Sequence, residues 1–213
     1  MSRTLVCISA SDGAGAEEIA PVVASRLGLM LVDGQIVARA AEKAGVQPDV
    51  VADAEERKSL VMRVLEYLPA STAGASAFTP YVPLEHLERG PAGDELRGLI
   101  RSAIEEIAER GSAVIVSHAA AVALGRRDGT LRVLVTGSEE ERRARLGAAE
   151  GLSEREAAKL VARGDANRAD YFKRFYGVAE LPTHYDLVLN TDRLSPEEAA
   201  EIVVQAAEGP AAA

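Results

Sequence analysis

Short apolar runs alternate along the chain with longer segments in which apolar residues recur at helical spacing. The runs at Val114–Val116 and Leu187–Leu189 are nearly continuous, which is typical of strands buried on both faces. This alternation predicts an α/β fold with a five-stranded parallel sheet and helices on both faces. The predicted strands are Leu5–Ser9, Met30–Val32, Ala113–Ser117, Arg132–Thr136 and Tyr185–Asn190.

Amphipathic periodicity predicts helices between these strands. Ser153 with Glu156 and Ser195 with Glu198 each have the spacing of a capping box, in which a serine and a glutamate bond each other's backbone amides. The predicted helices are Glu17–Leu27, Gly34–Ala44, Asp53–Tyr67, Gly93–Arg110, Ser138–Ala149, Ser153–Phe175 and Ser195–Ala207.

Composition narrows the class of protein. The 213 residues are 47% hydrophobic, so we expect a single domain over 1–207 with a disordered tail at 208–213. The Pro-, Gly- and Ser-rich stretch Pro69–Gly93 is typical of a functional flap or of disorder. A formal net charge of −9 argues against nucleic-acid and membrane-surface partners, and no apolar run suits a membrane span or signal sequence. We therefore expect a cytoplasmic protein, with no indication of a homo-oligomer and with its single cysteine, Cys7, buried in the core.

A glycine-rich loop, Ser9–Glu18, joins the first predicted strand to the first predicted helix. In this layout, backbone N–H groups and the positive end of the helix dipole point at an anion. Measured against the pattern Gly-x4-Gly-Lys-Ser/Thr, Gly15 is in place, whereas the lysine is Ala16 and the hydroxyl residue is Glu17. The loop keeps a peptide cradle for phosphate but lacks the side chains that reach the β- and γ-phosphates and the metal.

Asp33 follows the second predicted strand, and Arg39 lies six residues later. Open α/β sheets bind ligands at the carboxyl ends of their strands, although a helix N-cap explains Asp33 equally well. The same aspartate, twenty residues after Gly13, imitates a dinucleotide-binding fingerprint. That pattern is incomplete because its third glycine is Glu18.

Arginines gather on two predicted helices of the carboxyl-terminal third. Arg142 and Arg145 lie one turn apart, as do Asp165 and Arg168 on the next helix. Guanidinium groups from two helices can close over phosphates and neutralise charge in a transition state. The alternative is a solvated helix pair, in which Glu139–Glu141 bind these arginines at i,i+3 or i,i+4.

Several motifs follow one another: the Gly-Ala-Gly loop, Val-Asp33-x5-Arg39, Val-Ile-Val116, Glu-Glu141-Arg-x-x-Arg145, Gly-Leu-Ser-Glu154, Asp165-x-x-Arg168-x-x-Tyr-Phe172 and His-Tyr-Asp-Leu-Val-Leu-Asn190. In this order they resemble the cytidylate kinase-like family over about Leu5 to Val204, most specifically from Arg132 to Asn190. The resemblance implies a three-layer P-loop kinase fold. It also implies a mobile nucleotide-binding insert around 53–93 and an arginine lid around 142–171.

The resemblance further implies phosphoryl transfer from ATP, with Mg²⁺, to CMP or dCMP, without a metal site made of protein ligands. Ser117-His118 stands where the family has the Gly-Arg that meets the acceptor phosphate, which makes His118 a candidate at a strand's carboxyl end. The implied site residues are Gly13, Ala14, Gly15, Ala16 and Glu17 for the donor phosphates, Asp33, Arg39, His118 and Asp165 for the acceptor nucleotide, and Arg142, Arg145 and Arg168 for catalysis.

Two functions follow. The first is a nucleoside monophosphate kinase-like enzyme. The second is a degenerate kinase-like protein that binds a nucleotide or another anion and acts through partners. The second arises because the lost lysine, with Glu17 and Glu18 beside a triphosphate, weakens transition-state stabilisation.

Overall fold

The computed structural model describes residues 5–32, 93–116 and 119–209. The elements of the first half are β1 (Leu5–Ala10), α1 (Ala16–Leu27), β2 (Met30–Val32), α6 (Gly93–Arg110), β3 (Ala113–Val116) and α7 (Ala120–Leu124). Those of the second half are β4 (Thr130–Thr136), α8 (Glu139–Glu150), α9 (Glu154–Tyr176), η1 (Pro182–His184), β5 (Leu187–Asn190) and α10 (Pro196–Glu208).

The five described strands form one parallel sheet in the order β2-β3-β1-β4-β5, which confirms the predicted sheet. The central strand β1 pairs Leu5 with Ala113 of β3 and with Thr130 of β4. Two strand starts differ from the sequence prediction. β4 begins two residues earlier, and β5 begins at Leu187 because Tyr185 N donates to Pro182 O and closes η1.

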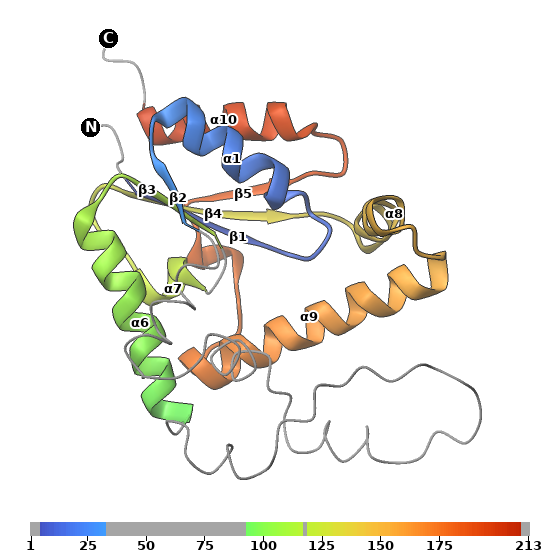
Figure 1. Ribbon diagram of the computed structural model, residues 1–213, viewed down its shortest axis with the longest axis horizontal. Helices are drawn as coiled ribbons and strands as arrows, with labels where there is room; N and C mark the ends of the chain where they lie inside the picture. The colour runs from blue at the N-terminus through green and yellow to red at the C-terminus, as the bar shows by residue number, and fades with distance from the viewer. Residues whose placement is uncertain (1–4, 33–92, 117–118, 210–213) are drawn as a thin grey trace.

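Helices cover both faces of the sheet, giving three layers (Figure 1). Alternation along β1 sends Val6 and Ile8 into one apolar cluster with α1 and α10. Leu5 and Cys7 face the other cluster, with α6 and α7, and Cys7 is fully buried as predicted. The core therefore lies on both sides of β1, whose carboxyl end leads into the glycine-rich loop.

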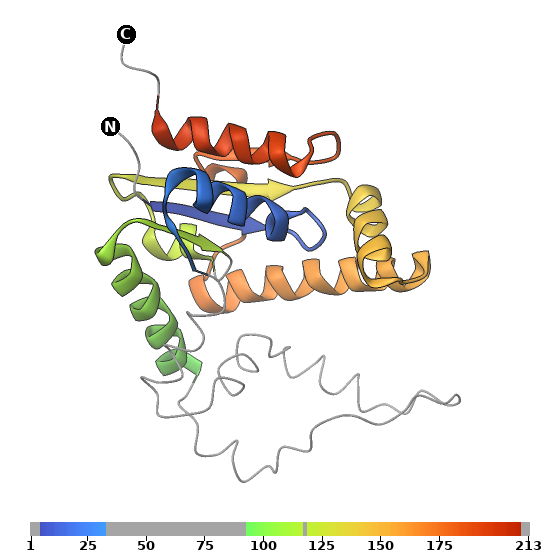
Figure 2. The same cartoon turned by 45° about the horizontal axis from the view of Figure 1, so that its top comes forward.

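The helices α8 and α9 lie beyond the carboxyl ends of β1 and β4, as Figure 2 also shows. α8 ends at Gly151 in a left-handed conformation, and the capping box of Ser153 and Glu156 starts α9 three residues later. The predicted capping box of Ser195 and Glu198 starts α10. The sharp turn between α8 and α9 brings arginines from both helices to one side of the sheet.

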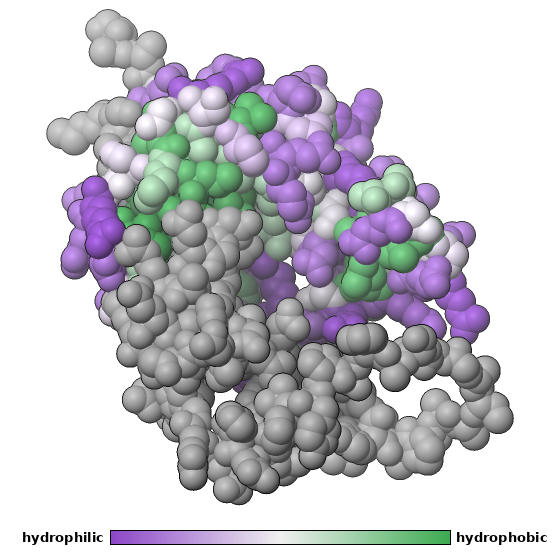
Figure 3. Space-filling model, in the orientation of Figure 1, coloured by the Kyte–Doolittle hydropathy of each residue, from purple (hydrophilic) through white to green (hydrophobic). Residues whose placement is uncertain are grey.

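Hydrophilic residues cover much of the outer surface of α10 in the space-filling view, as expected of an outer-layer helix (Figure 3). No described helix is long and apolar enough to cross a membrane. The predicted helices Gly34–Ala44 and Asp53–Tyr67, the flap Pro69–Gly93 and nearly all of the insert at 53–93 lie outside the described residues. The short helix α7 was not predicted, because Ala-Ala-Val-Ala-Leu is too short to show a periodic pattern.

Candidate functional site

The loop between β1 and α1 has the backbone shape of an anion-binding loop. Gly13 and Gly15 have φ angles of 75° and 86°, a region that residues with side chains rarely adopt. Gly15 is the N-cap of α1, so the amides of Ala16 and Glu17 have no acceptor within the helix, whereas Glu18 N donates to Gly15 O at 3.2 Å. These amides and the helix dipole can bind a phosphate.

The first residues of α1 occupy the positions of the lysine and the hydroxyl residue that the P-loop pattern requires. Ala16 is only 2% exposed and packs in the apolar cluster beneath α1, whereas Glu17 and Glu18 are exposed. Carboxylates at this position suit the helix dipole but repel a phosphate. Of the predicted donor-site residues, Ala14 uses its amide for a 3.0 Å hydrogen bond to Ser11 O, whereas the backbone amides of Ala16 and Glu17 remain available to an anion.

The three predicted catalytic arginines all donate to backbone carbonyl groups, one at the last residue of β1 and two in the loop that follows it. They come from α8 and α9, so the sequence correctly places them on one side of the molecule, but each has a defined intramolecular partner. The bonds are Arg168 Nη1 to Ala10 O at 2.7 Å, Arg142 Nη1 to Asp12 O at 3.3 Å and Arg145 Nη1 to Gly13 O at 3.3 Å.

Glycines allow this close approach of the helices to the loop. A Cβ atom added at Gly13 would lie 2.6 Å from the backbone oxygen of Arg142, which is too close for any side chain. A Cβ atom added at Gly164 on α9 would lie 1.9 Å from Oδ2 of Asp12. Backbone therefore leaves no room for a further carbon atom at Gly13, whereas at Gly164 the obstacle is the exposed side chain of Asp12.

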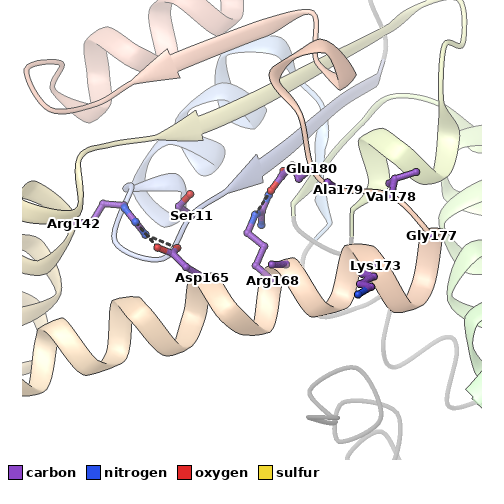
Figure 4. Close-up of a pocket in the computed structure, with 10 residues that line it drawn as sticks. Ser11, Arg142, Asp165, Arg168, Lys173, Gly177, Val178, Ala179 and Glu180 are labelled. Carbon is purple, nitrogen blue, oxygen red and sulfur yellow. Dashed lines mark hydrogen bonds and ion pairs between the residues drawn. The ribbon is translucent and has the colours of Figure 1, made fainter. Parts of the chain in front are cut away.

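Arg142 and Asp165 join α8 to α9 through two parallel hydrogen bonds of 2.9 and 2.7 Å, drawn in Figure 4. Arg142 is 6% exposed, and its Nε also donates to Gly137 O at 3.2 Å. Hydrogen bonding to Asp165 raises the pKa of the Arg142 guanidinium. The solvated-helix alternative does not describe Arg142, although Arg143 does form an i,i+4 pair with Glu139 at 3.7 Å.

A second ion pair joins α9 to the segment before β5. Arg168 donates twice to Glu180, with both distances 2.6 Å, and its guanidinium lies 5.3 Å from the ring centroid of Phe172. The Tyr185 hydroxyl also donates to Glu180 and is hydrogen-bonded to Ser9. Burial, followed by the hydrogen bond to Glu180, raises the pKa of Tyr185, so the phenol stays protonated.

Thr191 forms the third connection. Arg145 donates to Thr191 Oγ1 at 2.9 Å and also to the Thr191 carbonyl. The same hydroxyl lies 2.9 Å from Ala14 O and 3.1 Å from Thr136 O. Thr191 is 3% exposed and therefore ties the glycine-rich loop to the ends of both β4 and β5.

A cavity of about 720 Å³ opens between the loop and α9 (Figure 4). Its lining includes Ser11 from the loop, Arg142 from α8, Asp165, Arg168 and Lys173 from α9, and Glu180. Arg142 and Arg168 are neutralised by Asp165 and Glu180. Lys173 forms no ion pair within residues 5–32, 93–116 and 119–209, so it is the cavity's unpaired cation in that part of the chain.

The structure thus brings Asp165 together with Arg142, Arg145 and Arg168. The other predicted acceptor residues, Asp33, Arg39 and His118, lie outside the described residues. Sequence reasoning missed three residues that border or complete the site: Lys173, Glu180 and Thr191. For Glu180, the sequence offers one local indication: it follows Gly177, the glycine that ends α9, by three residues.

Solved structures share this fold at low sequence identity. An uncharacterised protein from Eubacterium ventriosum ATCC 27560 has a TM-score of 0.64 and 14% identity, covering 95% of this chain and 96% of that one. A sugar kinase from Janibacter sp. HTCC2649 has a TM-score of 0.52 and 19% identity, covering 96% and 93%. Shikimate kinase from Bacteroides thetaiotaomicron has a TM-score of 0.51 and 16% identity, covering 95% and 96%.

These likenesses confirm the predicted P-loop kinase fold. No curated protein matches the chain. The model of the cytidylate kinase-like family matches residues 5–193, a range that includes the glycine-rich loop, the arginines of α8 and α9 and Thr191. The chain therefore belongs to the cytidylate kinase-like family.

Proposed function

We propose that this protein is a cytoplasmic nucleoside monophosphate kinase that transfers the γ-phosphoryl group of ATP to CMP or dCMP. One observation carries the proposal. A single cavity is lined by Ser11 of the glycine-rich loop and by Asp165 and Arg168, which the family resemblance assigns to the acceptor side. Donor and acceptor groups would therefore meet in one space, as in-line phosphoryl transfer requires.

The donor triphosphate would lie on the amides of Gly13, Gly15 and Ala16, at the positive end of α1. Mg²⁺ would arrive with ATP as part of the substrate and neutralise the transferring phosphate. Mg²⁺ bound with nucleotides is commonly held by one or two carboxylates together with phosphate oxygens. Glu17, whose carboxylate is exposed, occupies the position of the missing hydroxyl ligand.

The arginines divide into two roles. Arg142 and Arg145 bind loop carbonyls and partners on other elements, so we assign them the positioning of the donor loop. Arg168 lines the cavity, and we assign it the neutralisation of charge during transfer. Lys173 would bind the acceptor phosphate, because it contributes a charge that no described carboxylate already neutralises.

The degenerate binding protein remains the second candidate, and a specific observation favours it. The residue in place of the P-loop lysine, Ala16, is a core residue, while Arg142 and Arg168 are already paired with carboxylates. A protein with this arrangement binds anions through backbone amides and Lys173, but supplies little new charge to a transition state.

ADP production from ATP distinguishes the two candidates when CMP, dCMP, UMP and AMP are offered separately. A kinase turns over CMP or dCMP, and Arg168→Ala lowers kcat by about a thousandfold. Arg143→Ala is the matched control, because Arg143 lies on α8 in an exposed i,i+4 pair. Equal activity of wild type and Arg168→Ala contradicts the site assignment. No activity with any acceptor, while calorimetry still detects nucleotide binding, supports the binding protein.

A further inference from the structure

A second cavity, of about 370 Å³, lies at the end of the sheet where β1 and β4 begin, opposite the end that carries the glycine-rich loop. It is built where the turn after α7 enters β4 and where the chain enters β5. The residues that line it are Arg126, Arg127, Asp128, Thr130, Arg132 and Asp186.

The two cavities are well separated. Thr130 pairs with Leu5 at the start of β1, whereas the glycine-rich loop begins after Ala10 at its end. Five residue steps along a strand correspond to about 16 Å. A ligand in the second cavity would therefore be distinguishable from one on the loop.

An ion pair forms the inner wall of this cavity. Arg132 is 7% exposed and donates three hydrogen bonds to the Asp186 carboxylate, from its backbone N, Nε and Nη2 at 3.0, 3.0 and 2.7 Å. Because each charge neutralises the other, this pair contributes little net charge to the cavity.

Arg126 and Arg127 supply the cavity's unpaired charge. Neither arginine forms an ion pair with any residue in the part of the chain that the structure describes. Their turn is fixed to the sheet, since Thr130 N donates to Arg127 O at 3.2 Å and Leu5 N donates to Gly129 O at 3.2 Å. With Asp128 as the opposing charge, the six lining residues keep a net charge of about +1.

The Thr130 hydroxyl is the second, independent observation. Thr130 is 8% exposed, and its Oγ1 has no hydrogen-bond partner among the described residues. Strand alternation puts Thr130 on the same face of β4 as Arg132, the face that borders the cavity. The oxygen atom is itself buried, so a ligand bonds it when the Thr130 side chain rotates toward the cavity, and that bond relieves a buried hydroxyl whose missing partner is unfavourable by about 1–3 kcal/mol.

We propose that this cavity binds a phosphate group, either as inorganic phosphate or as a phosphomonoester. Two guanidinium groups and one hydroxyl offer more donors than the two oxygens of a carboxylate accept, whereas a phosphate has enough oxygens for all three. The cavity volume also suits a phosphate with a small organic group. The site would serve a ligand other than the donor and acceptor on the carboxyl edge, and it does not depend on the proposed kinase activity.

Amide NMR spectra of the full chain, titrated with sodium phosphate at constant ionic strength, test the proposal. The expected result is a saturable shift of the Asp128, Gly129 and Thr130 amides with its own dissociation constant, separate from any shift at 11–17. Shifts confined to 11–17 would overturn it. Glycerol 3-phosphate in a parallel titration identifies the source: tighter binding than phosphate indicates a phosphomonoester, and equal or weaker binding indicates free phosphate.

Substitutions identify the side chains that donate hydrogen bonds to the phosphate. Arg127→Gln and Thr130→Val should each weaken phosphate binding at this site by about tenfold, as expected for one lost charge-assisted hydrogen bond. Thr130→Ser keeps the hydroxyl and should bind like the wild type. Arg155→Gln, an exposed arginine on α9, is the matched control. Unchanged affinity in both Arg127→Gln and Thr130→Val, with the fold intact by thermal unfolding, contradicts the proposal.

Discussion

Asp165 is the exposed half of an ion pair whose other half, Arg142, is buried: their side chains are 44% and 7% exposed. Water can solvate Asp165 well if Arg142 is lost, whereas Arg142 exposes only a small part of its side chain to the cavity and is poorly solvated if Asp165 is lost. The pair is therefore asymmetric, and removing the carboxylate is the more damaging change.

We predict that Asp165→Asn lowers the free energy of unfolding by about 1–3 kcal/mol, because it leaves a buried guanidinium without its charged partner. Urea denaturation measures the loss. The control is Glu105→Gln, whose partner Arg101 is exposed on the same helix and whose ion pair contributes about 0.3–0.5 kcal/mol. Equal losses in the two variants would show that Arg142 is solvated in solution.

Gly164→Ala should weaken nucleotide binding, because its new Cβ would displace the side chain of Asp12, a residue of the glycine-rich loop. In an open helix position the same substitution stabilises a protein by up to about 1 kcal/mol, and Gly98 on α6, with nothing within 4 Å, provides that control. Calorimetry with ATP compares the two. The double variant Asp12→Ala/Gly164→Ala removes the contact and should recover folding stability. If it does not, Asp12 is not the obstacle.

Lys173→Gln should raise KM for the acceptor monophosphate about tenfold and leave the thermal unfolding temperature unchanged, because the lysine lines the cavity without an ion-pair partner among the described residues. Lys159→Gln is a matched control on the same helix, at an exposed position outside the cavity lining. Where no turnover is detected, calorimetry with CMP gives the corresponding dissociation constants. Identical constants for the two variants contradict the assignment of Lys173.

The alkaline stability of the protein should depend on Cys7. Burial raises the pKa of this thiol from 9.0 to about 12, with Arg132 opposing the shift. Between these two values the unfolded chain releases the proton and the folded chain keeps it. Folding stability is therefore complete below pH 9 and falls as the pH rises, by at most about 1.4 kcal/mol per pH unit.

Urea denaturation of wild type and Cys7→Ala from pH 8 to pH 10 measures this effect. The alanine variant starts from a lower stability because it leaves a small cavity, but it should lose less stability with rising pH. Parallel pH dependences for the two proteins would indicate that the thiol ionises normally in the folded chain.

Local patterns predicted the described parts of the fold well. Both capping boxes, at Ser153 and Ser195, need only two residues three apart, and each begins the predicted helix. The buried strands were readable from their apolar runs. The prediction started β4 two residues too late, at Arg132. A charged residue is typical of the end of a buried strand, but here Arg132 is paired with Asp186, which is distant in sequence, and the strand extends back to Thr130.

For the candidate site, the sequence predicted that arginines of two helices lie close together, but it did not predict the contacts that these arginines make. Helical spacing placed Arg142 and Arg145 on one face, and both do contact the loop. The sequence contained no sign that Asp165 and Glu180 would neutralise two of the arginines, since these pairings depend on how α8, α9 and the segment before β5 pack together. Lys173 was missed because an exposed lysine on a long helix has no local pattern of its own.

The bonds from Arg168 to Ala10 O and from Thr191 to Ala14 O also govern the order in which the chain folds. Arg168 and Thr191 lie more than 150 residues after the glycine-rich loop whose carbonyl oxygens they bind, so the loop is synthesised well before these two partners. Closing such long segments is slow compared with forming local helices. The loop therefore reaches its final shape only after Thr191 has been synthesised, so nascent chains that end before Thr191 should lack a formed anion-binding loop.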